Sequence, residues 1–313
     1  CALPIYMSNS IFKNKKLVPV LAFLCAAGWS LAYPLIKLGY SNLNVASDDL
    51  GSKIRFAGIR FLMAGIIVII FALLQKKKMQ IKEGKSWLWL LLFAIVNISL
   101  HYCFSYVGLG YLPSSRSTIL DSMNGFFAII LSCLIFADDK FTKIKALGCV
   151  LGFSGILLIN IQLGQAMFSG ISLRGDGMIL LNALCGAFGG ILTRVVSKKM
   201  DMTLATGLSM AIGGMILCII TFFVHPYVGW NITAKSILII ISLVLISAVC
   251  FGIYNQLIAC NPISKIAIFN AFIPILGVIF SAIILGEPMK LKYFVAGMLV
   301  ALGVYVINKF DGK

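Results

Sequence analysis

A single carboxylate lies well inside an apolar stretch of this chain. Asp121 falls a few residues into the run 117–137, where an ionised side chain is costly unless it faces protein or water. At helical spacing it belongs to one small, polar face, whose members are Ser117, Asp121, Asn124, Ala128 and Ser132. Such a carboxylate can take up a proton or hold the amino group of a solute. The alternative is a structural aspartate, bonded to neighbouring serines or paired with Arg116 or Arg60.

A second polar stripe follows the apolar run 87–110. Asn97, His101 and Ser105 are spaced four apart, so they share one helical face. Polar side chains in a membrane helix must meet protein or water. The stripe therefore lines a cavity or makes hydrogen bonds between helices, and both interpretations stay open. His101 is a second candidate proton site, although no titrating partner lies near it in the sequence.

Aromatic and proline residues mark the first and ninth apolar runs. Trp29 and Tyr33 are four apart and share a face, where their rings could stack on a flat substrate or pack against neighbouring helices. Pro34 and Pro274 fall inside apolar runs, so they can kink the helices and act as gating points. These residues complete the first set of candidates.

An internal repeat relates two distant segments of the chain. Residues 113–148 recur at residues 262–297, with an offset of 149. Identical pairs are Pro113 with Pro262, Ser115 with Ser264, Ile119 with Ile268, Ile130 with Ile279, Ser132 with Ser281, Ile135 with Ile284 and Gly148 with Gly297. Asp121 falls on Asn270, which therefore joins the candidate site as the polar group of the second copy. Such a repeat is typical of membrane transporters.

The composition places the chain in a lipid bilayer. Of 313 residues, 60% are hydrophobic and 12% are charged, and the mean hydropathy is +1.02. A soluble domain could not bury so much apolar surface. We attribute the net charge of +16 to loops that flank membrane segments, not to nucleic-acid binding. The nine cysteines lack metal or redox spacing, and no nucleotide loop or catalytic triad occurs, so we expect no catalytic residue, cofactor or metal.

Apolar runs long enough to cross a bilayer as helices recur along the whole chain. We predict ten, at about 17–38, 57–74, 87–110, 117–137, 146–163, 177–193, 203–224, 236–258, 266–286 and 291–308. The longest connections are expected at 39–56 and 163–176. The predicted fold class is an all-α integral membrane protein with ten transmembrane helices.

Lysine and arginine positions determine the predicted orientation. With a cytoplasmic N-terminus, 17 of the 26 basic residues fall on the inner side and 9, including Arg60, fall on the outer side. Both termini are therefore expected in the cytoplasm. Residues 1–16 would form a cytoplasmic segment, 17–162 a first five-helix repeat and 176–308 a second. Because five is odd, the second repeat enters the membrane from the opposite side, and the repeats are inverted.

Short motifs in a fixed order carry a family resemblance. The segment Cys25–Lys37 contains a tryptophan and ends on a lysine. Further motifs are Arg60-Phe-Leu-Met-Ala64, Gly175-Asp176-Gly177, Asn270-Ala-Phe-Ile-Pro274, Leu285-Gly-Glu-Pro288 and the glycine-rich run around Gly297 and Gly303. Over about residues 17–308 the chain resembles the EamA-type carriers of the drug/metabolite transporter superfamily. It departs from that family at Gly125, where proline is common, and at Ala137-Asp138-Asp139, where the family has Gly-Glu.

The resemblance implies ten helices around a central cavity, with export as the usual direction. We therefore predict a secondary transporter that exports small metabolites, such as amino acids, purines or amine-bearing and drug-like solutes, by alternating access. Its partners would be the substrate, the lipid bilayer and, if Asp121 titrates, protons. The chain would act as a monomer or dimer in the plasma or inner membrane. The alternative is a receptor or an intramembrane enzyme on the same scaffold, but an enzyme needs converging catalytic groups, and one embedded carboxylate does not supply them.

Overall fold

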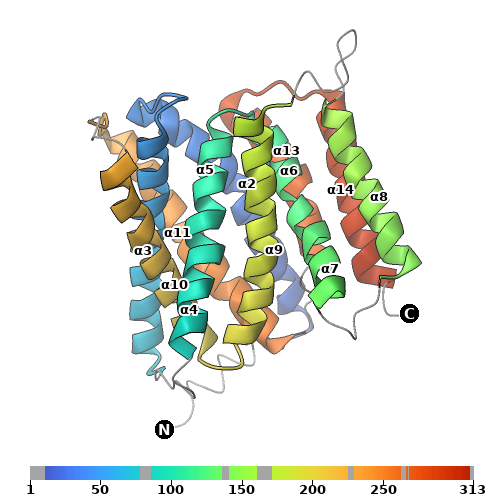
Figure 1. Cartoon of the computed structure of the whole chain (residues 1–313), viewed down its shortest axis with the longest axis horizontal. Coiled ribbons are helices and arrows are strands. Elements are labelled where there is room, and N and C mark those ends of the chain that lie inside the picture. Colours follow the sequence, from blue (N-terminus) through green and yellow to red (C-terminus); the bar gives the residue numbers. More distant parts are fainter. Residues whose placement is uncertain are drawn as a thin grey trace.

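The regular secondary structure of the described chain is entirely helical. The computed structural model describes residues 11–77, 86–135, 141–160, 171–224, 229–261, 266 and 268–310, and no strand occurs in these ranges. The helices lie side by side in one bundle, roughly along a common direction (Figure 1). The helix that begins at Leu17 and the helix that ends at Phe310 have these ends on the same face of the bundle (Figure 1).

The first half of the chain contributes the helices coloured blue to green in Figure 1. They are α2 (Leu17–Leu43), α3 (Leu50–Leu74), α4 (Ser86–Ala94), the π-helical segment η1 (Ile95–Leu100), α5 (His101–Leu109), α6 (Ser114–Asp121), α7 (Met123–Ile135) and α8 (Lys143–Asn160). The expected long connection at 39–56 is wrong, because α3 begins at Leu50. Asp49 caps this start by accepting a hydrogen bond from the Ser52 backbone N–H at 2.8 Å.

The second half of the chain contributes the helices coloured yellow to red. They are η2 (Leu173–Gly177), α9 (Met178–Val196), α10 (Met202–Val224), α11 (Ala234–Cys260), η3 (Ile268–Ala271), α13 (Phe272–Leu285) and α14 (Leu291–Phe310). Each of the predicted apolar runs is helical over most of its described residues. Most of the expected connection at 163–176 lies outside the described residues.

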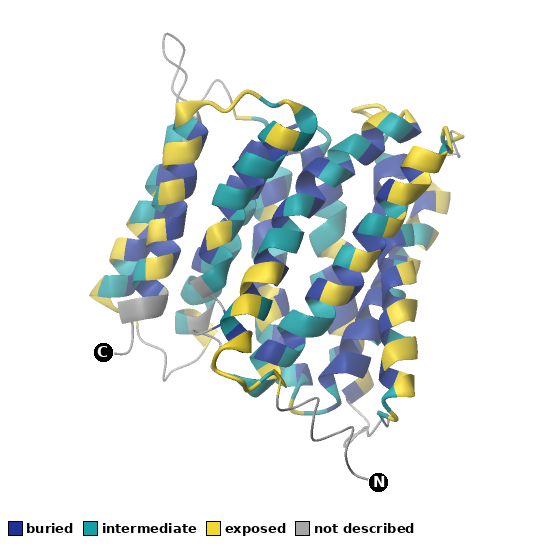
Figure 2. Cartoon of the chain, turned by 180° about the vertical axis from the view of Figure 1, so that it is seen from behind, coloured by how far each residue is buried: buried dark blue, intermediate teal, exposed yellow. Residues whose placement is uncertain are grey.

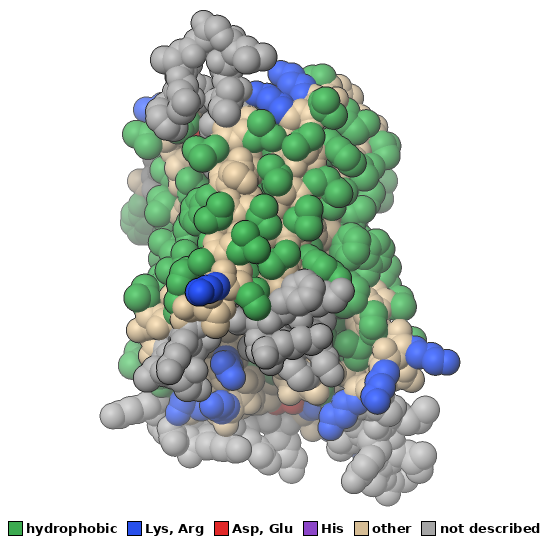
Figure 3. Space-filling view, turned by 90° about the vertical axis from the view of Figure 1, so that its right-hand side faces the viewer, with side chains coloured by type: hydrophobic (Ala, Val, Ile, Leu, Met, Phe, Trp, Pro, Cys, Tyr) green, Lys and Arg blue, Asp and Glu red, His purple; other side chains and the backbone are tan. Residues whose placement is uncertain are grey.

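Several of these helices have the length and composition of membrane spans. Seven helical stretches of the described chain qualify, namely Leu17–Leu43, Leu50–Leu74, Ser86–Leu109, Ser114–Ile135, Leu173–Val196, Met202–Phe223 and Ala234–Cys260. Phe269–Leu285 and Leu291–Ile307 are shorter apolar helices. Exposed side chains lie on the outward faces of the helices (Figure 2). On the face shown in Figure 3, hydrophobic side chains cover the middle, and Lys and Arg side chains lie toward the two ends. The chain is therefore a multi-pass membrane protein.

Three helices change their geometry where polar candidates lie. The π-helical segment η1 contains Asn97 and runs directly into α5 at His101. A turn at Ser122 separates α6 from α7 immediately after Asp121, and the 3-10 segment η3 carries Asn270 just before α13. Helix interruptions at membrane depth are tolerated where the chain is buried in protein or lines a cavity. The sequence predicted a continuous helix at each of these places.

The two halves approach most closely where glycines replace side chains. Helix α3 packs on α10, and α8 packs on α14. A Cβ on Gly65 of α3 would lie only 2.8 Å from the Ala211 Cα of α10, so this position admits no side chain without moving a helix. These contacts hold the halves together around the space between them.

Candidate functional site

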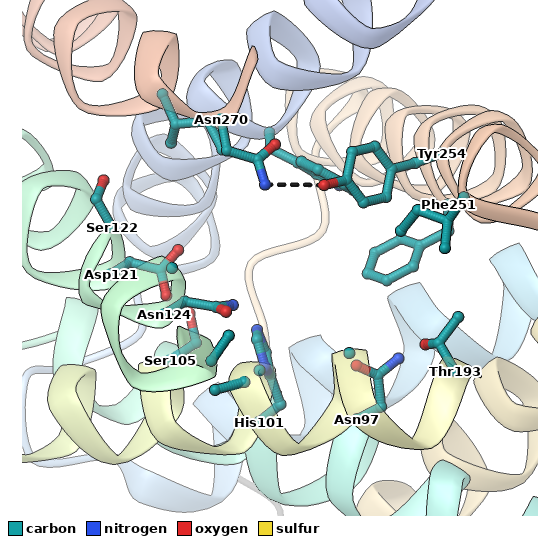
Figure 4. Close-up of a pocket in the computed structure, with 18 of the residues that line it drawn as sticks. Asn97, His101, Ser105, Asp121, Ser122, Asn124, Thr193, Phe251, Tyr254 and Asn270 are labelled. Carbon is teal, nitrogen blue, oxygen red and sulfur yellow. Dashed lines mark hydrogen bonds between the residues drawn. The ribbon is translucent and has the colours of Figure 1, made fainter. Parts of the chain in front are cut away.

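A cavity of about 480 Å³ lies between the two halves of the bundle. Its lining comes from α2, α5, α6, α7, α9, α11, η1 and η3 among other elements. All eight side chains predicted to form a pathway line it, namely Trp29, Tyr33, Asn97, His101, Ser105, Asp121, Asn124 and Asn270. The labelled polar residues surround an open centre, with Asn270 and Tyr254 across from Asp121 and His101 (Figure 4).

Asp121 is held by neighbours that the sequence did not suggest. Its carboxylate accepts a hydrogen bond from the Asn182 amide of α9. The Tyr33 hydroxyl lies within hydrogen-bonding reach of the same carboxylate, and Ser105 lies within reach of Tyr33. The suggested pairing with Arg116 or Arg60 is wrong, because neither forms an ion pair with Asp121. The carboxylate is half-buried and faces the cavity.

The expected small, polar face around Asp121 is only partly realised. Asp121, Asn124 and Ala128 line the cavity, but Ser117 is fully buried and donates to the Pro113 carbonyl at 3.0 Å. The turn at Ser122 rotates α7 relative to α6 and brings Ser122 itself to the cavity. The side chain of Ser132 lies outside the described residues.

Aromatic rings form the wall opposite Asp121. The Trp29 ring centroid lies 4.7 Å from that of Tyr254 and 5.7 Å from that of Phe251, both on α11. The Asn270 amide donates to the Tyr254 hydroxyl at 2.8 Å (Figure 4). The buried Trp29 Nε1 and Asn270 Oδ1 have no hydrogen-bond partner in the structure. The wall therefore combines flat apolar faces with a donor and an acceptor that have no partner within the protein.

Asn97 and His101 enter the cavity from η1 and α5. Glycines on α9 make room for them, since a Cβ on Gly186 would lie 2.7 Å from His101 Cε1. The His101 ring lies 4.5 Å from the Tyr102 ring, and its Nδ1 has no partner in the structure. The stripe predicted at 97–105 thus faces the cavity along its length.

The two candidate gating prolines are buried in neighbouring helices and are not among the described residues that line the cavity. Pro34 lies inside α2 and Pro274 inside α13, and these two helices pack together. Near them the Ser30 hydroxyl donates to the Ala26 carbonyl at 2.7 Å and lies 3.2 Å from the Ile273 carbonyl. A role of either proline in gating stays a prediction.

Charged contacts join the helices at one end of the bundle, on the face opposite the start of α2 (Figure 1). The Glu287 carboxylate accepts from the Ser114 N–H at 2.7 Å, the Ser115 N–H at 3.1 Å and the Ser115 hydroxyl at 2.7 Å. Arg116 forms an ion pair with Asp176, with Nη2 2.6 Å from Oδ1. Helix α6 is thus bound at its N-terminal end to residues of the second half of the chain, and its last residue is Asp121.

Sequence reasoning missed two residues at or beside the cavity. Phe251 lines the cavity, and Asn182 donates a hydrogen bond to Asp121, but neither was among the predicted side chains. The signal for Asn182 is present in retrospect, because it is a lone amide in the apolar run 177–193. Arg60 was counted as a flanking residue on the outer side, but it lies buried inside α3 and lines the cavity.

A polar cavity between the two halves of a helical membrane bundle is the arrangement of a membrane transporter. A family model described as the EamA-like transporter family matches residues 16–161 and 173–309. The chain belongs to the EamA-like transporter family.

Relatives and a solved structure agree with this assignment. The uncharacterized transporter YvbV of Bacillus subtilis is 28% identical over 294 residues, covering 92% of this chain and 90% of that protein. The probable amino-acid metabolite efflux pump of Escherichia coli is 23% identical, covering 92% of this chain and 93% of the pump. A crystal structure 12% identical superposes with a TM-score of 0.66 over 94% of this chain and 97% of that one, so the fold is shared. The family and these names indicate a transporter of small molecules rather than an enzyme.

Proposed function

We propose that the protein exports small metabolites by alternating access, and that the cavity around Asp121 is the site that moves between the two sides of the membrane. One observation carries the proposal. Eight side chains, from Trp29 to Asn270 in the sequence, converge on one cavity between the halves of the bundle, and Asp121 is the one acidic residue among its described lining. A membrane-embedded carboxylate beside a cavity is a site for a proton or a cationic group.

The contacts between helices support two repeats related by a two-fold axis. In the proposed repeat, α2 corresponds to α9, α5 to α11 and α7 to α13. The contact between α2 and α11 then has its equivalent in the contact between α9 and α5. The contact between α2 and α13 likewise has its equivalent in the contact between α9 and α7. The pairs α3–α10 and α8–α14 match themselves under the same exchange. A two-fold operation exchanges equivalent contacts in this way. We propose ten crossings, with 17–162 and 176–308 as inverted repeats and with both termini, including residues 1–16, in the cytoplasm.

The contacts of Glu287 and Arg116 support a state that is closed on the outer side. They join α6 to the second half at the end opposite the start of α2. In the proposed orientation that end faces away from the cytoplasm, so a substrate would enter the cavity from inside. Release would then require these contacts to break while the cavity residues are occupied.

Amino acids and related amine-bearing solutes are the substrates we propose first, with purines and drug-like amines as the wider class. The Escherichia coli relative is named an amino-acid metabolite efflux pump. In this chain Asp121 would receive the ammonium group or the coupling proton, and the rings of Trp29, Phe251 and Tyr254 would contact a flat or apolar side chain.

Counterflow in proteoliposomes tests the proposal. Vesicles with purified protein are loaded with one unlabelled solute, and uptake of the radiolabelled solute is followed for amino acids, purines and amines in turn. We expect exchange for a subset of amino acids or amines, with empty vesicles as the control. Folded protein that exchanges no member of the panel would show that the proposed substrate class is wrong.

A further inference from the structure

Arg60 places a positive charge in the middle of the bundle. It lies in α3 and is 1% exposed, yet it is among the residues that line the cavity. Its Nε donates to the Ser247 hydroxyl at 2.6 Å and lies 3.2 Å from the Leu243 carbonyl, and its Nη1 donates to the Tyr106 hydroxyl at 3.0 Å. These contacts hold one edge of the guanidinium against α5 and α11.

The other edge of the guanidinium has no acceptor. Among the described residues, no group bonds Nη2 of Arg60, and no carboxylate forms an ion pair with it. Its hydrogen-bond acceptors are all neutral oxygens, and its Cζ also lies 5.1 Å from the Phe61 ring centroid. A buried cation without a counter-charge is costly in a membrane protein, because a neutral acceptor compensates only part of the lost hydration. A group that brings a negative charge to this edge would relieve that cost.

Basic side chains outnumber acidic ones in the described cavity lining. Arg60, Lys145 and Arg194 are basic, whereas Asp121 is the one acidic residue among the lining residues that the structure describes. Tyr102 lines the same cavity as Arg60 and Asp121. The Arg60 Cζ lies 6.0 Å from the Tyr102 ring centroid, so the cation is near the aromatic wall of the cavity.

We propose that Arg60 binds the carboxylate of the transported solute and thereby makes the cavity selective for solutes that carry one. The planar guanidinium presents parallel N–H donors that match the two oxygens of a carboxylate. Asp121, which lines the same cavity, receives the cationic group when the solute has one. This proposal rests on the proposed function only in taking the cavity as the substrate site.

A purely structural Arg60 is the alternative, because the residue also cross-links α3 to α5 and α11. The two roles differ in what they predict for ligands. A structural arginine supports the cavity for every ligand equally, whereas a carboxylate-binding arginine discriminates between ligands that differ only in that group. The test therefore compares matched ligands and does not depend on stability alone.

Binding to purified protein in detergent provides the test, at constant ionic strength and without any transport step. The probes share one phenylpropyl skeleton: 3-phenylpropionate, 3-phenylpropanol and 3-phenylpropylamine. We expect the wild-type protein to bind the carboxylate about tenfold or more tightly than the neutral alcohol, as one charge-assisted interaction provides. Arg60→Gln should abolish that preference while it leaves binding of the alcohol unchanged. Arg55→Gln, the same change on the same helix at a position that does not line the cavity, is the matched control.

Each result decides the matter. A wild-type protein that binds the carboxylate no better than the alcohol overturns the proposal, as does an Arg60→Gln protein that keeps the preference. If Arg60→Gln fails to fold, Arg60→Lys keeps the charge but loses the paired donors, and it should retain a reduced preference. A full preference in Arg60→Lys would overturn the role of the paired donors. Failure of counterflow with every solute would count against the proposed function and leave this binding result standing.

Discussion

Asp121 and Asn182 meet across the interface between the two halves of the chain. Asn182 is fully buried on α9, and its amide donates to the carboxylate that ends α6. A carboxylate that keeps a neutral donor and a tyrosine, but no cation, retains capacity for a further partner. The arrangement therefore fits a residue that exchanges partners during a transport cycle better than one that only stabilises the fold.

Replacing Asp121 by asparagine should separate these roles. We expect Asp121→Asn to fold, since the equivalent position of the second copy carries Asn270. Concentrative transport should fall by about tenfold or more, because an amide cannot bind a proton or hold an ammonium by charge-assisted bonds of ~1.5–3 kcal/mol. Exchange of solute across the membrane can persist. The measurement is accumulation against exchange in proteoliposomes.

Asp201→Asn provides the matched control for this substitution. Asp201 pairs with Lys77 at 3.0 Å and does not line the cavity, so its loss should leave accumulation intact. Wild-type accumulation in Asp121→Asn would make the residue structural. His101, whose Nδ1 has no partner, would then be the next candidate for proton coupling.

At the scale of elements, α6 links the cavity to the end of the bundle where Glu287 and Arg116 make their contacts. It begins at Ser114, beside the Glu287 carboxylate, and ends at Asp121. Because the helix has eight residues, a change at one end is felt about two turns away at the other. Occupation of the cavity and opening of this end can therefore be coupled through one short, stiff element.

Glu287→Gln should loosen the closed end. A glutamine has one acceptor oxygen for three donors, and it loses the charge that favours a helix N-terminus. A loss of ~1–3 kcal/mol raises the population of the open state by about fivefold or more. In a cysteine-free background, labelling of Ser117→Cys by an impermeant maleimide should rise accordingly from the side that Glu287 faces. Lys290→Gln in the same loop is the control, and equal labelling in both variants would argue against a gate at Glu287.

The contact between α3 and α10 tests how tightly the halves must pack. Gly65→Ala should destabilise the folded protein by about 1–3 kcal/mol, because the new Cβ meets the backbone at Ala211. Gly252→Ala is the matched control, since its Cβ would have nothing within 4 Å and alanine favours a helix. Thermal unfolding in detergent compares the two. A Gly65→Ala protein as stable as its control would show that the helices can separate at no cost.

For the whole molecule, the start of α2 and the end of α14 lie on the same face of the bundle (Figure 1). The chain between them must therefore cross the membrane an even number of times. The predicted excess of lysine and arginine on one side favours a cytoplasmic location for both termini. We predict that a fluorescent reporter fused to the C-terminus is active in the cytoplasm, and that a phosphatase fused there, which needs export, is inactive. An inactive fluorescent reporter together with an active phosphatase would contradict both the ten predicted crossings and the inverted repeat.

The sequence by itself determined the properties that are local along the chain. Apolar runs long enough to cross a bilayer, the four-residue spacing of Asn97 and His101, and the match of Asp121 with Asn270 all follow from residue order, because helical periodicity fixes which positions share a face. From these patterns we predicted the helices, the family resemblance and a set of side chains that line the cavity.

The tertiary structure alone decided what each face meets. The contacts in and beside the cavity join residues from different helices. They include the bonds of Asn182 to Asp121, of Asn270 to Tyr254, and of Arg60 to Ser247. Periodicity within one helix says nothing about the rotation of the next helix against it. The break at Ser122 also depends on packing, since in isolation the residues on either side favour one continuous helix. The partners in the cavity are therefore a property of the packed bundle.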